Sequence, residues 1–196
     1  MKRLFTICLA PLVLVFAVAG CATQPGQSEA GYTALFDGTN LNSWTLLGNA
    51  NWRLQDGLAQ AELGSGLLVS KAQYGDFHLK AEFWVDAPAN SGIFFRCADP
   101  KKIASAVCYE ANIFDTRPDP SFGTGSIPGT AQASTVLKTG NQWNTMEVTA
   151  KGVQLTVVLN GIQTVNVEDS KYSKGFVALQ YSSGVVKFRK VLIKPL

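Results

Sequence analysis

The segment 109–115, YEANIFD, holds two acids and one amide at spacings that suit acid–base chemistry. In an extended strand Glu110 and Asn112 share a face, because they are two residues apart. Asp115 falls on the opposite face unless a bulge or the end of the strand redirects it. A general acid or base must reach its substrate by a hydrogen bond. Glu110 and Asp115 are therefore candidates for acid–base groups. The alternative is that both acids lie on a solvated strand edge.

The segment 90–96, NSGIFFR, is the densest polar stretch of the chain. If its second half is a strand, Phe94 and Arg96 share one face, and Arg96 would then lie over the surface of a sheet. The alternative is an exposed arginine that pairs with a carboxylate.

Aromatic residues and histidine give further indications. The chain has four tryptophans, Trp44, Trp52, Trp84 and Trp143. Tryptophans suit stacking on sugar rings and suit the core of a β-sandwich equally well, and we expect most of these four in the core. The chain has one histidine, His78, which excludes a metal site built from several histidines of one chain. The sequence specifies neither a cofactor nor a divalent metal, although a bound metal would be compatible with it.

The elements that must position these residues are strands. Apolar and polar residues alternate with a period of two through 78–86 and from 145 to 159. Asn160-Gly161 then separates two such runs, which is the strongest short-range signal for a β-hairpin. Two more runs, 176–181 and 185–193, complete the pattern. Many short strands with Gly and Pro turns predict an all-β fold, either a sandwich or a barrel.

Composition indicates a folded domain. Of the 196 residues, 46% are hydrophobic and only 16% are charged, which is the opposite of the balance in disordered chains. The length fits one domain, or at most a small pair. Lys and Arg together number 17 against 14 Asp and Glu, and they form no basic stripe. We therefore expect no nucleic-acid partner.

Residues 1–20 have the pattern of an export signal. Lys2 and Arg3 precede an apolar run, 4–19, that is too short and too soon interrupted to predict a transmembrane helix. The run ends in 18–21, VAGC, which resembles the bacterial lipobox, where the cysteine is acylated and becomes the new N-terminus. We therefore expect a lipid on Cys21. The alternative is an ordinary cleavage site followed by a stray cysteine.

The next residues predict a tether and a location. Segment 21–33 is short and polar and contains Gly and Pro, as flexible tethers do. Ala22 is not aspartate, so retention in the inner membrane is not signalled. By analogy with enterobacterial sorting, we expect a lipid-anchored protein of the bacterial cell envelope, at the outer membrane and facing the periplasm. The lipid would be its only membrane contact, and 34–196 would form the folded domain.

Two cysteines, Cys97 and Cys108, remain after the expected processing. An oxidising compartment favours a disulfide between them. Closing so short a loop would stabilise the fold by about 2–3 kcal/mol. The alternative is a pair of buried free thiols.

Short motifs along residues 34–196 resemble, in order, those of one family. Its LF(D/N)GxxLxxW opening is similar to 35–44, and its YExQIxD strand is similar to 109–115. Further similar segments are Trp52 with Asp56-Gly57, 74–77, Glu82-Phe83, 90–96, Trp143-Asn144, Asn160-Gly161, Leu179-Gln180 and Phe188-Arg189. The family is that of the 3-keto-disaccharide hydrolases, also described as 3-keto-glucoside lyases and hydratases. The resemblance implies a concanavalin A-like jelly-roll sandwich of two antiparallel sheets, with a sugar on the concave sheet.

The resemblance also implies a substrate, a glucosyl unit with a ketone at C3. That ketone acidifies the C2 hydrogen and makes the aglycone on C1 a β leaving group, so cleavage can proceed by elimination and hydration. In these terms Glu110 takes the C2 proton, Arg96 steadies the enolate oxygen and Asp115 protonates the leaving oxygen. The residues that we assign to substrate binding are Asn90, Ser91, Asn112, Gln180, Glu82 and Trp84.

The sequence departs from the family pattern at three positions. Ser182 stands where the family often has a histidine, Asn112 stands where glutamine is usual, and Lys190 follows Arg189 where asparagine is common. If that histidine is catalytic, this protein binds sugars without cleaving them. Three hypotheses therefore remain: an enzyme that acts on 3-keto-glycosides, a non-catalytic carbohydrate-binding lipoprotein, and a structural envelope protein that has kept the fold without a ligand.

Overall fold

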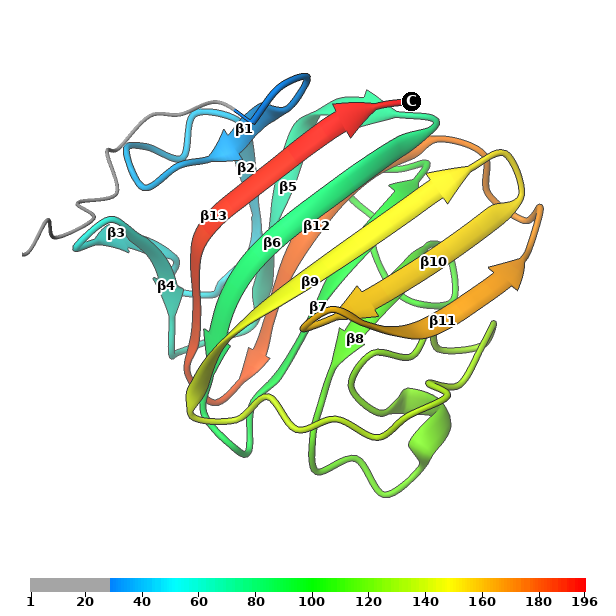
Figure 1. Cartoon of the computed structure of the whole chain (residues 1–196). Helices are drawn as coiled ribbons and strands as arrows, with labels where there is room; N and C mark the ends of the chain where they lie inside the picture. Colours follow the sequence, from blue (N-terminus) through cyan, green and yellow to red (C-terminus); the bar gives the residue numbers. More distant parts are fainter. Residues whose placement is uncertain (1–28) are drawn as a thin grey trace, which may run out of the picture.

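A computed structural model describes residues 29–196 of the chain. The predicted signal peptide, the lipidation site Cys21 and the tether up to residue 28 lie outside the described residues and stay predictions. The described residues form two β-sheets and one 3-10 turn, η1 (Pro120–Phe122) (Figure 1). Within this part of the chain, no helix is long and apolar enough to cross a membrane.

The two sheets differ in size, and every pair of named strands is antiparallel. The larger sheet has the order β11-β10-β9-β6-β13-β4-β3, with β1 added beside β13. Its strands are β1 (Thr33–Phe36), β3 (Arg53–Gln55), β4 (Leu58–Ala61), β6 (Phe77–Val85), β9 (Gln142–Lys151), β10 (Gln154–Leu159), β11 (Ile162–Glu168) and β13 (Val186–Pro195).

The smaller sheet has the order β2-β5-β12-β7-β8. Its five strands are β2 (Trp44–Gly48), β5 (Gly66–Tyr74), β7 (Asn90–Cys97), β8 (Tyr109–Ile113) and β12 (Gly175–Ser183). The two sheets lie one in front of the other in Figure 1. This arrangement confirms the predicted all-β sandwich of two antiparallel sheets.

The core lies between the sheets because alternation directs one face of each strand inward. In β6 every odd-numbered residue from Phe77 to Val85 is buried, and every even-numbered residue is partly exposed. β7 differs, since both of its faces are covered. Ile93 and Phe95 belong to the main core, whereas Phe94 belongs to a second apolar cluster on the outer face of the five-stranded sheet. The smaller sheet is therefore partly shielded from solvent on its outer side.

The predicted hairpin between β10 and β11 is present. Asn160 and Gly161 have φ angles of 51° and 80°, which a tight two-residue hairpin turn requires at both central positions. Leu159 pairs with Ile162 directly beside the turn. The hairpin places β11 at the edge of the larger sheet.

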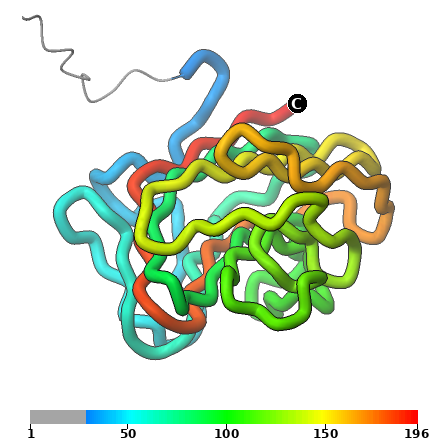
Figure 2. The backbone as a smooth tube through the Cα atoms, turned by 60° about the horizontal axis from the view of Figure 1, so that its bottom comes forward, coloured from blue at the N-terminus to red at the C-terminus, as the bar shows by residue number. Residues whose placement is uncertain are grey.

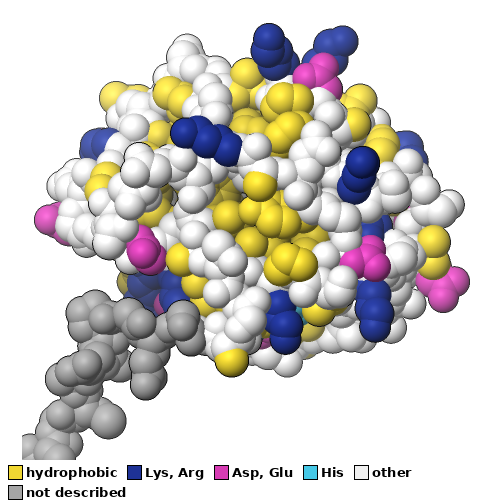
Figure 3. Space-filling model, turned by 90° about the horizontal axis from the view of Figure 1, so that it is seen from above, with side chains coloured by type: hydrophobic (Ala, Val, Ile, Leu, Met, Phe, Trp, Pro, Cys, Tyr) yellow, Lys and Arg dark blue, Asp and Glu magenta, His cyan; other side chains and the backbone are white. Residues whose placement is uncertain are grey.

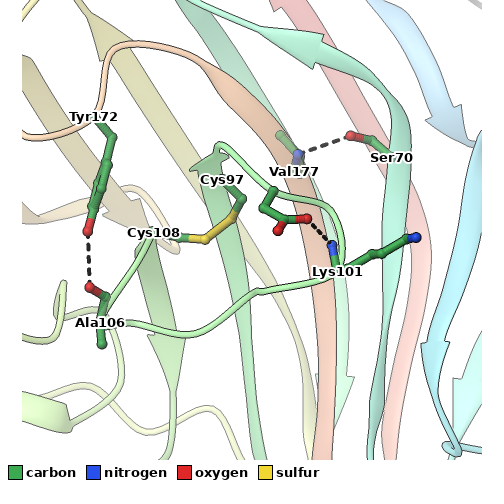
Figure 4. Close-up of a disulfide and its surroundings, with 8 residues drawn as sticks. Ser70, Cys97, Lys101, Ala106, Cys108, Tyr172 and Val177 are labelled. Carbon is green, nitrogen blue, oxygen red and sulfur yellow. Dashed lines mark hydrogen bonds between the residues drawn. A yellow bond between two sulfur atoms is a disulfide. The ribbon is translucent and has the colours of Figure 1, made fainter.

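A disulfide joins Cys97, at the end of β7, to Cys108, just before β8, and confirms the predicted pairing (Figure 4). The two Cα atoms are 4.7 Å apart. Ile103, in the loop that the bridge closes, packs against the apolar cluster on the outer face of the sheet. The Tyr172 hydroxyl donates a hydrogen bond of 3.1 Å to the carbonyl of Ala106 in the same loop. The bridge therefore holds this loop against the five-stranded sheet.

The connection between β8 and β9, residues 114–141, folds over one end of the sandwich and contains η1 (Figure 2). Two backbone hydrogen bonds tie it to β8. The amide of Gly125 donates to the carbonyl of Asn112 at 2.8 Å, and the amide of Asn112 donates to the carbonyl of Ser126 at 3.0 Å. This connection forms a wall beside the end of β8.

The opposite end of the sandwich, where the C-terminus lies, has a different surface (Figure 3). Hydrophobic side chains gather in the middle of this end, and charged side chains lie scattered around them. Cations and anions are interspersed on this view, so the charges do not merge into one basic surface.

Candidate functional site

A surface hollow of about 180 Å³ lies on the outer face of the five-stranded sheet, where three neighbouring strands meet their connecting loops. Strands β7, β8 and β12 contribute polar side chains, namely Asn90, Glu110, Asn112 and Gln180. The loops contribute Ser105, Phe114, Arg117 and Phe122. The hollow therefore brings together four of the residues that the sequence predicted for the site.

The register of the sheet explains this grouping. Gln180 pairs with Gly92, and Gly92 pairs with Asn112, so the three residues form one row across β12, β7 and β8. Glu110 precedes Asn112 by two residues and shares its face. A Cβ atom at Gly92 would lie 2.5 Å from Oε1 of Glu110. The absent side chain of Gly92 thus leaves the space that the Glu110 carboxyl group occupies, a role that sequence reasoning missed.

Glu110 is a buried acid without a partner. Its residue is 6% exposed, and its carboxyl group has no hydrogen bond or ion pair within residues 29–196. Burial raises the pKa of Glu110 to about 8, because the charged form loses hydration and gains nothing in return. Near neutral pH this group is mainly protonated, and a small rise in pH ionises it. It can therefore exchange a proton with a ligand in the hollow.

Three amide side chains complete the polar lining. Oε1 of Gln180 is buried and has no hydrogen-bond partner among the described residues, so a ligand hydroxyl that donates to it would relieve an unfavourable state. Nδ2 of Asn90 lies 3.5 Å from Oγ of Ser182. The Asn112 amide donates to the carbonyl of Phe122 in the loop wall. An acid and three amides are groups that suit sugar hydroxyls.

Arg117 is the cation of this hollow, and sequence reasoning missed it. Its guanidinium carbon lies 5.7 Å and 5.1 Å from the ring centroids of Phe114 and Phe122, and these cation–π contacts restrain it. No carboxylate pairs with it in the part of the chain that the structure describes. The same part contains no group of three or more His, Cys, Asp or Glu side chains that could hold a metal ion. Only its closeness to YEANIFD in the sequence could have indicated Arg117.

Arg96 does not line the hollow, which corrects its predicted position beside Glu110. Its φ of 53° is left-handed, and the register between β7 and β12 shifts beside it, so the alternation of β7 breaks there. The side chain is 1% exposed. It donates to the carbonyl oxygens of Gly75 (3.2 Å), Gly152 (2.8 Å) and Tyr172 (3.0 Å) and to Oδ1 of Asp76 (3.0 Å). Arg96 thus joins three connections of the sandwich.

Asp115 also lies outside the hollow, just beyond the end of β8. Its carboxylate accepts hydrogen bonds from Oγ1 of Thr124 (2.6 Å), the amide of Thr139 (2.6 Å), Oγ1 of Thr139 (3.0 Å) and the amide of Gly140 (2.9 Å). It lines an adjoining cavity of about 180 Å³ within the β8–β9 connection, which shares Phe114 and Arg117 with the hollow. The predicted meeting of Asp115 and Glu110 in one site therefore does not occur, because four hydrogen bonds hold Asp115 in the loop.

Three residues predicted to bind substrate lie on other faces. Ser91 is buried on the inner face of β7, and its hydroxyl donates to the carbonyl of Gln180 at 2.7 Å. Glu82 and Trp84 point outward from β6, which belongs to the eight-stranded sheet. Alternation indicates the face of a residue within its strand, but it does not indicate which sheet the strand joins. The structure therefore separates Glu82 and Trp84 from Glu110.

The four tryptophans divide evenly, although we expected most of them in the core. Trp44 is buried, and Trp52 packs against the core from the side. Trp84 and Trp143 point outward from neighbouring strands of the eight-stranded sheet. Two tryptophans are therefore available at the surface.

Comparison with known families identifies the chain. The family model for 3-keto-α-glucoside-1,2-lyase-like domains matches residues 31–194, and the chain belongs to this family. No curated protein matches the sequence.

Solved structures share the fold. Two proteins from Parabacteroides distasonis that were assigned as glycosyl hydrolases are similar to this chain. The first is 20% identical with a TM-score of 0.76, over 85% of this chain and 94% of that one. The second is 25% identical with a TM-score of 0.71, over 84% and 99%. The carbohydrate-binding module CBM66 from Bacillus subtilis is 19% identical with a TM-score of 0.63, over 78% and 95%. The fold is thus the predicted jelly roll, of the glycosyl hydrolase-like or carbohydrate-binding kind.

Proposed function

We propose that this member of the 3-keto-α-glucoside-1,2-lyase-like family cleaves the glycosidic bond of 3-keto-glucosides, with Glu110 taking the C2 proton. The observation that carries the proposal is the Glu110 carboxyl group, which is buried, lacks a partner among the described residues and shares a hollow with the unpaired oxygen of Gln180. A ketone at C3 makes the neighbouring C2 hydrogen acidic. A base whose pKa is about 8 is well matched to such a proton near neutral pH.

The reaction proceeds by elimination of the aglycone and then by hydration of the double bond that results. Ionised Glu110 takes the C2 proton, and the electron pair forms a C2–C3 double bond while the ketone oxygen becomes an enolate. Arg117 lines the same hollow, so we assign stabilisation of this oxyanion to Arg117 in place of Arg96. The enolate then returns to the ketone, a C1–C2 double bond forms and the bond from C1 to the leaving oxygen breaks. Addition of water across C1 and C2 completes a net hydrolysis.

Glu110 is the base that removes the C2 proton and can also be the acid that protonates the leaving oxygen. Among the residues that line the hollow, Glu110 is the only acid. After it has taken the C2 proton, it can deliver that proton to the leaving oxygen of a β-glucoside, in which the C2 hydrogen and the C1 oxygen lie on the same face of the ring, and the elimination is then syn. In an α-glucoside the two lie on opposite faces, so the leaving oxygen takes its proton from water and the elimination is anti. Asn90 and Gln180 hold the ring through its hydroxyl groups.

The experiment that tests this function is an incubation of the purified full-length chain, in deuterated water, with a panel of 3-keto-glucosides and their unoxidised parents. We expect cleavage of the keto compounds alone, with deuterium at C2 of the product. Product that carries no label at C2, even in short incubations, refutes the elimination. A lack of cleavage with every keto compound refutes the enzyme proposal itself.

A second candidate function, sugar binding without cleavage, is favoured by Ser182 at the position where the family often has a histidine. In this case isothermal titration calorimetry detects binding of a 3-keto-glucoside, while no product forms. The variant Ser182→His returns the family residue next to Asn90. Turnover by Ser182→His but not by the parent chain would support the binding function. Turnover by the parent chain would exclude it.

We also propose that the chain is a lipoprotein of the bacterial envelope, anchored at the outer membrane through Cys21 and facing the periplasm. The support is the export-like pattern of residues 1–20 and the VAGC segment at 18–21. Cells that express Cys21→Ser should incorporate no labelled palmitate into the chain and should accumulate the unprocessed precursor. If parent and variant appear as the same unlabelled soluble species, the lipid anchor is refuted.

A further inference from the structure

The outer face of the eight-stranded sheet carries a pair of neighbouring tryptophans that the hollow around Glu110 does not include. Trp84 on β6 and Trp143 on β9 are direct cross-strand partners. Their neighbours Phe83 and Asn144 are buried, so both indoles project from the outer side of the sheet. Trp143 is 38% exposed. Two adjacent indoles on a sheet surface form a platform on which a flat apolar face can stack.

Cations hold both indole rings in place. The guanidinium carbon of Arg189 lies 4.3 Å from the ring centroid of Trp143, and Nζ of Lys187 lies 4.7 Å from that of Trp84. Arg189 is itself fixed by its ion pair with Glu82. Rings that are already ordered lose little conformational freedom when a ligand stacks on them. The platform is therefore preorganised for binding.

A polar hollow adjoins this platform. Glu82 pairs with Thr145 in the outward row next to Trp84 and Trp143. Both residues line a hollow of about 180 Å³, together with Glu147 and two lysines. Carboxylates accept hydrogen bonds from hydroxyl groups, and ammonium groups donate to them. Apolar stacking beside such groups is the combination that a pyranose ring requires, since the ring has apolar faces and a polar edge.

Most charges of the hollow are already paired, which favours an uncharged ligand. Glu29 pairs with Lys80 at 3.1 Å and with Lys190 at 3.2 Å. Glu147 lies 3.1 Å from the ring of His78. With Glu82 bound to Arg189, each acid that lines the hollow has a basic partner. An ion would have to break these pairs, whereas a sugar hydroxyl can share them.

We propose that this face is a second, non-catalytic glycan site. Trp84 and Trp143 stack on pyranose units of a neutral polysaccharide, and Glu82 and Thr145 bind the hydroxyl groups. The site is on the opposite sheet from Glu110, so the two sites can be occupied together and binding here does not depend on the activity proposed above.

Affinity electrophoresis of the full-length chain tests the site, in native gels that contain dextran, laminarin or barley β-glucan. We expect at least one of these neutral polysaccharides to retard the parent chain. Trp143→Ala should raise the dissociation constant about 10-fold, and Trp84→Ala combined with Trp143→Ala should abolish retardation. Trp143→Phe should keep most of the affinity, because an aromatic ring remains. Thermal unfolding of each variant establishes that it is folded.

A further variant locates the binding. Val153→Ala truncates a similarly exposed apolar residue in the β9–β10 turn and should have no effect. The proposal is overturned if no polysaccharide retards the parent chain or if the folded double variant is retarded equally.

Discussion

Two buried titratable residues on neighbouring strands, Arg96 on β7 and Glu110 on β8, have opposite surroundings. Arg96 donates to three carbonyl groups and to Asp76, whereas the Glu110 carboxyl group has no partner among the described residues. A buried charge that is fully bonded belongs to the framework, because removing it leaves unpaired groups behind. A buried acid without a partner lowers the stability of the fold, and its presence is accounted for if a bound ligand supplies the missing hydrogen-bond partner. The contrast therefore assigns chemistry to Glu110 and architecture to Arg96.

The largest expected effect comes from Glu110→Gln, which keeps the shape of the side chain and removes the base. A general base contributes about 10²–10⁴-fold to a rate, so turnover of a 3-keto-glucoside should fall by about that factor in steady-state assays. Binding of the sugar should survive, because the amide still hydrogen-bonds a hydroxyl group. The matched control is Glu168→Gln on the exposed edge of β11, which should leave turnover unchanged. Full activity of Glu110→Gln would show that Glu110 is not the general base.

Gly92→Ala tests whether the position of Glu110 matters as much as its presence. The added Cβ would lie 2.5 Å from Oε1 of Glu110 and must displace the carboxyl group. A misplacement of about 1 Å can lower a rate about 10²-fold, so kcat should fall by that order while the fold remains. Gly75→Ala is the matched control, since its Cβ would come no closer than 4.0 Å to the Ser173 carbonyl. Equal rates for the two variants would show that Gly92 does not position the acid.

Regular alternation explains what the sequence could predict of this site. Glu110 and Asn112 on β8 and Gln180 on β12 lie in regularly paired parts of strands on either side of β7, so their common face follows from the period of two. Arg96 has a left-handed backbone at a shift in register, and no pattern of residue types in NSGIFFR reveals that shift. Asp115 lies beyond the end of its strand, where alternation no longer applies.

Long-range structure accounts for the other differences. Trp84 and Glu110 lie on different sheets because β6 joins the eight-stranded sheet. This placement depends on the pairing of β6 with β9 and β13, which lie far along the chain. Arg117 reaches the hollow because the β8–β9 connection folds back on β8, through contacts such as that of Gly125 with Asn112. Local sequence carries neither kind of information, whereas the overall sandwich and the Cys97–Cys108 bridge follow from patterns within short segments.

Arg96→Lys tests the architectural side of the contrast. A lysine keeps the charge but cannot reach the three carbonyl groups and Asp76 together, because it lacks the planar fork of arginine. The free energy of unfolding should fall by about 2–4 kcal/mol in urea denaturation. The fraction that stays folded should keep the KM of the parent chain, since Arg96 does not line the hollow. A normal stability combined with a large loss of kcat would return Arg96 to the catalytic group.

The last expected effect is a gradual dependence of stability on pH that arises from Glu110 alone. Burial raises the pKa of Glu110 to about 8 in the folded chain from an ordinary value of 4.5. Between these values the folded state binds more protons than the unfolded state, so stability must fall as pH rises. The contribution of the protonated Glu110 carboxyl group to the free energy of unfolding is complete below about pH 4.5 and is lost as pH rises through about 8. At higher pH the free energy no longer changes through this group.

The slope from this one group is at most about 1.4 kcal/mol per pH unit. Urea unfolding of the parent chain and of Glu110→Gln, from about pH 5 to about pH 9, measures it as the difference between the two curves. Every other titrating group, His78 included, is common to both chains and cancels in that difference. We expect the free energy of unfolding of Glu110→Gln to rise steadily relative to that of the parent chain until about pH 8, and the difference to stay constant at higher pH. Parallel curves would mean that the Glu110 carboxyl group is solvated or paired in solution, and the contrast with Arg96 would then lose its physical basis.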